Sequence, residues 1–214
     1  MRPDLVIFDC DGVLVDSERA TNEGLVENLA HYGFQTTVED AFRLFVGGTM
    51  AGLRDKVIEN GVDLPDDWLD EIYAQMFARL KAGVPPVPGV IDVLDRLDRA
   101  GIPYGVGSNG PPEKMDITLG QNNMIARFGG HIYSAHTVGI AKPDPGLFLH
   151  VAAQFDAAPD RTVVIEDSAT GVRAATAAGM RCYGYAGDTP AEKLRAVGAI
   201  PFFDMTDLPG FLNI

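Results

Sequence analysis

The sequence has little cysteine, little positive charge and no long apolar segment, and each shortage excludes a class of protein. Its 214 residues include 2 cysteines, without the paired spacing of a zinc site or the number that a disulfide framework needs. With 17 Lys and Arg against 30 Asp and Glu, the formal net charge is −13, which argues against nucleic acid and anionic membranes as partners. Because no run is long enough for a signal peptide or a membrane span, we expect a cytoplasmic protein.

The first apolar segment leads directly into two acids that are one residue apart. Leu5–Phe8 is typical of a strand that is buried on both faces of a parallel sheet. Asp9 follows it, and Asp11 can reach the same place if the chain turns at Gly12. Ligands bind at the carboxyl ends of such strands, so these acids indicate a site that uses a cation or a substrate. A surface turn rich in Asp and Gly is the alternative, and it suits Asp16 better than Asp9.

The rest of the chain divides into a helical segment and an alternating one. Residues 17–85 carry apolar side chains at helical spacing, which predicts a small bundle of about four helices. Pro85–Gly89 then forms a stiff linker, after which helix and strand alternate. We therefore predict an α/β fold in which residues 1–16 and 86–214 form a doubly wound parallel sheet. The helical insertion after the first strand is either a cap that opens and closes over Asp9 or a fixed appendage.

Polar residues follow three further strand or loop positions. Ser108, Asn109 and Gly110 come after an apolar strand and could hold phosphate oxygens, although this is also an ordinary turn. Lys142 precedes a rigid Pro-Asp-Pro segment and could balance the charge of the acids, unless it is a solvated surface lysine. Glu166 and Asp167 end another buried strand. These neighbouring acids, together with Asp9, predict a divalent cation, and hard oxygen ligands favour Mg²⁺; helix capping explains either acid alone but not the pair.

These four motifs resemble those of the haloacid dehalogenase superfamily of phosphohydrolases, in the same order along the chain. The resemblance implies that Asp9 is the nucleophile, Asp11 the general acid and base, and that Ser108 and Lys142 complete the catalytic set. It also implies metal binding by Asp9, Asp11 through its backbone carbonyl, Glu166 and Asp167. We therefore expect a Mg²⁺-dependent phosphatase of a small phosphate ester, acting through an aspartyl phosphate, as a monomer or weak homodimer.

The form Glu166-Asp167-Ser168 is similar to that of the β-phosphoglucomutase and sugar-phosphate phosphatase branch. Mutases of that branch carry a His near the position of Thr21, and a Lys and Arg in a loop that Val46–Met50 replaces here, so we favour hydrolysis. The segment Ser108–Pro111, followed by Lys114-Met115 and later by Asn123-Met124, resembles bacterial phosphatases that act on 6-phosphogluconate, which suggests a sugar or sugar-acid phosphate. Asn109, Gly110 and, in the cap, Arg54 are the candidate substrate-binding residues. A sugar phosphomutase and a catalytically silent binding protein with this fold are the alternatives.

Overall fold

The computed structural model describes residues 2–45 and 50–214. Most of the loop that we compared with the mutases, residues 46–49, therefore lies outside the described residues. Contacts divide the chain into two compact units, one formed by Met1–Asp16 with Pro85–Ile214 and the other by Ser17–Val84. None of the helices in the described ranges is long and apolar enough to cross a membrane.

The larger unit is built on a six-stranded sheet whose order is β3-β2-β1-β4-β5-β6. All neighbouring strands in it pair in parallel. The strands are β1 (Leu5–Phe8), β2 (Tyr104–Ser108), β3 (Ile132–Ser134), β4 (Thr162–Glu166), β5 (Arg181–Tyr185) and β6 (Ile200–Phe202). The chain builds the sheet outward from β1 in one direction, returns to the other side of β1, and continues outward from β4. The strand order reverses between β1 and β4, and open α/β sheets bind ligands at the carboxyl ends of the strands at such a point.

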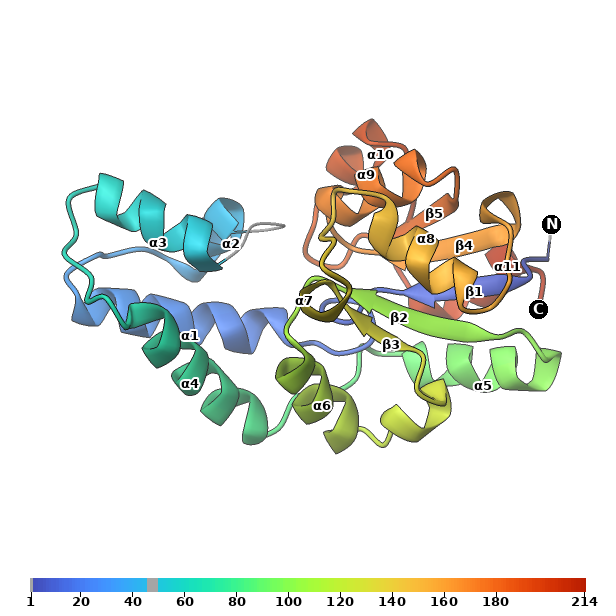
Figure 1. Ribbon diagram of the computed structural model, residues 1–214, viewed down its shortest axis with the longest axis horizontal. Helices are drawn as coiled ribbons and strands as arrows, with labels where there is room; N and C mark the ends of the chain where they lie inside the picture. Colours follow the sequence, from blue (N-terminus) through green and yellow to red (C-terminus); the bar gives the residue numbers. More distant parts are fainter. Residues whose placement is uncertain (1, 46–49) are drawn as a thin grey trace. The chain divides into compact units, whose positions relative to one another are not determined.

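Helices cover both faces of this sheet, which confirms the predicted doubly wound α/β fold. On one face, α8 (Gly146–Ala153) contacts β1 and β2, while α9 (Ala169–Ala177) and α10 (Ala191–Ala196) contact β5. Figure 1 shows α5 (Val90–Ala100) on the opposite face, where it contacts α11 (Leu208–Leu212). The remaining helical segments of this unit are α6 (Pro112–Gln121), α7 (Ala135–Val138) and the short 3-10 turns Ile125–Phe128, Pro159–Arg161 and Met205–Asp207.

The core of the larger unit depends on strands that alternate their apolar side chains between the two faces. Leu5 and Ile7 of β1 share a buried cluster with Phe148 and Val151 of α8. In β2, Gly107 lets α8 approach closely, because an added Cβ would lie 3.2 Å from the Phe148 ring. Bulky apolar side chains in β1 and a glycine in β2 thus let α8 pack closely against the sheet.

The strand β6 was not predicted, since we read Pro201-Phe202-Phe203 only as part of the tail. Pro201 lies within β6 and pairs in register with Gly184 of β5. Proline cannot donate to a sheet ladder, but β6 is an edge strand, so its outward side needs no partner strand. The proline that weakened the strand pattern in the sequence is therefore compatible with the fold.

The smaller unit consists, in its described residues, of α1 (Glu18–His31), α2 (Val38–Phe45), α3 (Met50–Glu59) and α4 (Trp68–Lys81). Trp68, Ile72 and Leu29 are buried between these helices. A polar network also joins α1 to α4: the Trp68 indole N–H donates to Asn28 Oδ1 over 2.7 Å, and Asn28 Nδ2 donates to Glu71 over 2.8 Å. Trp68 is therefore a core residue of this unit, with its polar edge satisfied inside the bundle.

Candidate functional site

The predicted site residues of the larger unit come from neighbouring strand ends. Asp9 follows β1, Ser108 is the last residue of β2, and Glu166 is the last residue of β4. The Asp9 backbone N–H donates to the Ile165 carbonyl over 2.9 Å, so the β1–β4 pairing continues up to Asp9. Asp9, Ser108 and Glu166 are all buried. The parallel sheet alone therefore brings together residues that are far apart in the sequence.

Lys142 is a buried cation that joins two of the acids. Its Nζ lies 2.8 Å from Asp9 Oδ1 and 2.7 Å from Glu166 Oε1, and its side chain is 3% exposed. The ammonium also lies 4.9 Å from the centre of the Phe148 ring. Burial lowers the pKa of Lys142, but the charges of Asp9 and Glu166 outweigh that effect and raise it overall. Lys142 is therefore a buried positive charge between Asp9 and Glu166, and a solvated surface position is excluded.

Asn109 holds the backbone of Lys142 through both ends of its side-chain amide. The Lys142 N–H donates to Asn109 Oδ1 over 2.9 Å, and Asn109 Nδ2 donates to the Lys142 carbonyl over 3.1 Å. The Lys142–Pro143 peptide bond is cis. These contacts give Asn109 a place in positioning the lysine, in addition to the substrate contact that we predicted from the sequence, which remains a prediction.

Glu166 is fully buried and its carboxylate is turned back toward the start of α9. Its Oε2 accepts hydrogen bonds from the backbone N–H groups of Asp167 and Ser168 over 3.0 and 2.8 Å, and from the Ser168 hydroxyl over 2.9 Å. Its Oε1 accepts from Lys142. An added Cβ at Gly171 would overlap this carboxylate. Glu166 thus links Lys142 to the start of α9, and the absence of a side chain at Gly171 leaves room for the Glu166 carboxylate.

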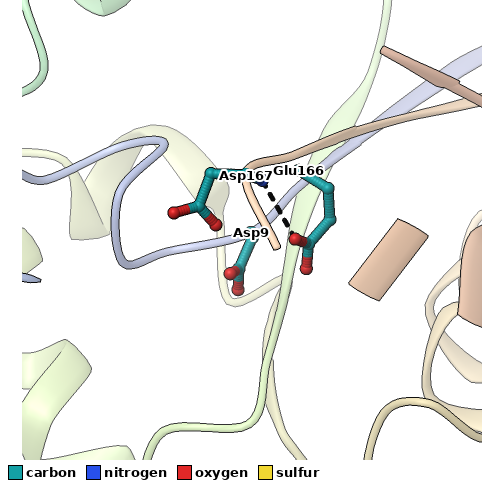
Figure 2. A group of neighbouring side chains, drawn as sticks. All are labelled: Asp9, Glu166 and Asp167. Carbon is teal, nitrogen blue, oxygen red and sulfur yellow. Dashed lines mark hydrogen bonds between the residues drawn. The ribbon is translucent and has the colours of Figure 1, made fainter. Parts of the chain in front are cut away.

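Three carboxylates could together hold a metal ion. Asp9, Glu166 and Asp167 each offer an oxygen, and these oxygens lie within 4.8 Å of one another. In the view of Figure 2 the Asp9 carboxylate lies between those of Asp167 and Glu166. Asp9 Oδ1 is buried, and the Lys142 ammonium lies 2.8 Å from it as its ion-pair partner.

A divalent cation fits this group on electrostatic grounds. Burial is the main cause that raises the pKa of Asp9 to about 7, while the charge of Lys142 opposes the rise and that of Glu166 adds to it. A cation beside Asp9 and Asp167 would offset both the burial cost of Asp9 and the repulsion between the acids. Hard carboxylate oxygens suit Mg²⁺.

Asp11 lies on the turn that follows Asp9 and is not part of that three-carboxylate group among the described residues. The turn closes through hydrogen bonds from Gly12 to the Val15 carbonyl over 2.9 Å and from Leu14 to the Cys10 carbonyl over 2.9 Å. Gly12 has a φ of +71°, and an added Cβ would overlap the Asp167 carboxylate. Gly12 therefore serves both the turn and the close approach of Asp167, which the sequence signalled only as a turn.

The loop after β2 offers small polar groups near the acids. Ser108 Oγ accepts from the Gly110 N–H over 3.0 Å, and the Ser134 hydroxyl donates to the Gly110 carbonyl over 2.6 Å. Sequence reasoning missed Ser134, although it stands at the end of β3, the next strand end along the sheet. It also missed Lys114 as a site residue: its Nζ lies 2.8 Å from Asp11 Oδ1.

Arg54, the predicted substrate-binding residue of the helical insertion, belongs to α3 of the smaller unit. Its Nη2 lies 3.8 Å from Asp66 Oδ1, and its side chain is 25% exposed. Its Nε is buried without a hydrogen-bond partner among the described residues. The guanidinium is therefore only weakly engaged within its own unit, and its contact with substrate remains a prediction.

Comparisons with known proteins agree with the motifs. A family model described as haloacid dehalogenase-like hydrolase matches residues 3–179. The chain is 29% identical over 210 residues to the 6-phosphogluconate phosphatase of Escherichia coli K12, an alignment that covers 97% of this chain and 94% of that protein. It is 30% identical over 200 residues to a phosphoglycolate phosphatase of Pseudomonas putida, covering 89% of this chain and 73% of that protein. A conserved haloacid dehalogenase-like protein of unknown function from Agrobacterium tumefaciens has a solved structure that matches with a TM-score of 0.88 at 37% identity, covering 98% of this chain and 97% of that one.

Proposed function

We propose that this chain, which belongs to the haloacid dehalogenase-like hydrolases and is a phosphoric monoester hydrolase, releases phosphate from a small phosphorylated sugar or sugar acid in a Mg²⁺-dependent reaction. The resemblance seen in the sequence is thereby confirmed at the level of the family. The observation that carries the proposal is the buried carboxylate of Asp9, which lies at the sheet's reversal point between Lys142 and Asp167.

In the first step Asp9 attacks phosphorus as a carboxylate. An oxygen–phosphorus bond forms to Asp9 as the ester bond breaks, and the Asp11 carboxyl gives its proton to the departing alcohol. Lys142, held 2.8 Å from Asp9, balances the charge that collects on the nucleophile and on the phosphoryl oxygens. The products of this step are the free alcohol and an aspartyl phosphate on Asp9.

In the second step the Asp11 carboxylate takes a proton from water, and that water attacks the aspartyl phosphate. The bond between Asp9 and phosphorus breaks, which releases inorganic phosphate and restores the Asp9 carboxylate and the Asp11 carboxyl. Ser108 and the backbone N–H groups of its loop could hold the phosphoryl oxygens, because a hydroxyl and amides bind anions without adding charge.

Asp9, Asp167 and the Asp11 backbone carbonyl would hold Mg²⁺, with Glu166 acting through water. Glu166 is given the indirect role because both of its oxygens already accept hydrogen bonds from Lys142 and from the start of α9. When bound, Mg²⁺ supplies positive charge that keeps Asp9 ionised and neutralises the phosphoryl group.

The substrate class follows from charge and from the relatives. The named substrates of the two phosphatase relatives, 6-phosphogluconate and phosphoglycolate, both carry a carboxylate as well as a phosphate. A protein with a net charge of −13 needs local cations to bind such anions. We infer that the helical unit serves as a cap that sets specificity, and that Arg54, with its incompletely satisfied guanidinium, binds the substrate's second anionic group.

A sugar phosphomutase remains the second candidate. The mutases that this chain resembles carry a His near position 21, where this chain has Thr21, whose hydroxyl donates to the Ser17 carbonyl over 2.8 Å. This contact favours hydrolysis over a second transfer to sugar.

The test is release of inorganic phosphate from 6-phosphogluconate, phosphoglycolate, hexose phosphates and p-nitrophenyl phosphate, with Mg²⁺ and with chelator. We expect metal-dependent release that Asp9→Asn abolishes and that Asp116→Asn, an exposed acid on α6, leaves unchanged. Activity retained by Asp9→Asn would overturn the nucleophile assignment. Isomerisation of a sugar phosphate with a bisphosphate primer, in place of release, would establish the mutase.

A further inference from the structure

Lys114 and Asp11 form an ion pair at the edge of the site. Lys114 lies in the first turn of α6, directly after the Ser108–Gly110 loop. Its Nζ lies 2.8 Å from Asp11 Oδ1, and both side chains are only 12% exposed. An ion pair this far from solvent is weakly screened and restricts both side chains. The contact therefore fixes Asp11 relative to the loop that we assign to the phosphoryl group.

Gly110 lies against both members of the ion pair. The position that a Cβ on Gly110 would occupy lies 3.3 Å from Ser108 Oγ, 3.4 Å from Asp11 Oδ2 and 3.7 Å from Lys114 Cδ. The aliphatic part of Lys114 thus lies beside Gly110, and Asp11 Oδ2 lies beside the same glycine as Ser108 Oγ. One carboxylate oxygen thus lies beside Lys114, and the other lies beside the Ser108–Gly110 loop that we assign to the phosphoryl group.

We propose that Lys114 is a positioning residue, which holds the Asp11 carboxyl group in line for proton transfer to the leaving alcohol. The proposal rests on the proposed function, because it deepens the role given there to Asp11. A proton donor is effective only within hydrogen-bond reach of the departing oxygen, and a displacement of about 1 Å can cost about 100-fold in rate. Lys114 supplies that placement and does not itself touch the substrate.

The test compares two esters that differ in their need for a proton donor. In an aliphatic phosphate such as 6-phosphogluconate, the leaving group departs as an alkoxide unless it is protonated. In p-nitrophenyl phosphate, the p-nitrophenolate leaves readily without a proton. We would measure kcat/KM for both esters, since this ratio reports only the steps up to departure of the leaving group. The variants are Lys114→Met, which keeps the apolar stem, Lys114→Arg, and Lys193→Met as an exposed lysine control on α10.

We expect Lys114→Met to lower kcat/KM for the aliphatic ester about 10- to 100-fold and for p-nitrophenyl phosphate less than about threefold. Lys114→Arg should recover part of the loss, and Lys193→Met should match the wild type. On an Asp11→Asn background, Lys114→Met should cause no further loss, because the residue through which Lys114 acts is already disabled.

Other outcomes would overturn the inference. An equal loss for the two esters would show that Lys114 binds the phosphoryl group or only stabilises the fold. An additional loss on the Asp11→Asn background would show that it acts independently of Asp11. If the wild type releases phosphate from neither ester, the proposed function fails and this inference fails with it; if the wild type is active and Lys114→Met is unchanged, only this inference fails.

Discussion

Gly171→Ala tests the buried connection between Glu166, Lys142 and α9. Gly171 lies in the first turn of α9, and an added Cβ would overlap the Glu166 carboxylate. That carboxylate is fully buried and can move only by giving up its contacts with Lys142 and Ser168. The substitution therefore forces a choice between a distorted helix start and a broken ion pair.

The expected magnitude is the difference between two opposing effects. Alanine is favoured over glycine inside a helix by about 1 kcal/mol. Breaking a buried ion pair costs about 3–5 kcal/mol, because it leaves uncompensated charge in the interior. We therefore expect the free energy of unfolding to fall by about 2–4 kcal/mol, although the substitution is one that ordinarily stabilises a helix.

The assay is urea unfolding followed by far-ultraviolet circular dichroism, with Gly120→Ala as the matched control. Gly120 also lies within a helix, α6, but its added Cβ would meet only Ile125 Cδ1 at an ordinary 3.4 Å. Gly120→Ala should be neutral or more stable by up to about 1 kcal/mol. If Gly171→Ala proves as stable as Gly120→Ala, the described arrangement of Glu166 is wrong.

Two further predictions concern the metal group. Asp9→Asn should stabilise the metal-free protein relative to wild type increasingly from about pH 4 to pH 7. The raised pKa of Asp9, about 7 against the usual 3.8, makes the native state hold a proton that the unfolded chain has lost, so wild-type stability falls as the pH rises through that window. The difference in unfolding free energy between the variant and the wild type, measured in chelator, should reach up to about 4 kcal/mol and stay constant above about pH 7. A difference that does not depend on pH would contradict the burial of the Asp9 charge. Gly12→Ala should weaken Mg²⁺ binding at least about 10-fold in calorimetry, because its Cβ would displace Asp167. Gly130→Ala, with a φ of +90° and nothing within 4 Å of its added Cβ, carries similar backbone strain and should bind Mg²⁺ like the wild type.

Much of the fold and the position of the site could be predicted because they depend on local patterns. A buried apolar run predicts a strand, and in a parallel sheet every strand delivers the next residue to the same edge. Asp9, Ser108 and Glu166 each follow or end such a run, so their convergence follows once the sheet is recognised. The strand β6 escaped prediction because Pro201 is tolerated only where the sheet ends, and the sequence does not mark which strand is the edge.

Side-chain pairings were less accessible, because they depend on distances between segments that only the folded chain brings together. The motifs predicted that Lys142 lies near the acids, but not that it joins Asp9 to Glu166. They predicted substrate contact for Asn109, which remains a prediction, but they did not predict that its amide contacts the Lys142 backbone at both ends. Lys114 belonged to the segment that resembles the 6-phosphogluconate phosphatases, but that resemblance did not indicate that it contacts Asp11.

The sequence by itself determined the family and the α/β architecture, and it predicted the acids to which we assign the chemistry, because these depend on residue types at strand ends. Only the tertiary structure decided how each charge is used. It turned Glu166 away toward α9 and left Asp9 Oδ1 buried beside the Lys142 ammonium. It also required glycine at positions 12 and 171, because the space beside each is occupied by a carboxylate from another part of the chain. A side chain's charge is set by its residue type, whereas its partner is set by which segments the folded sheet places beside it.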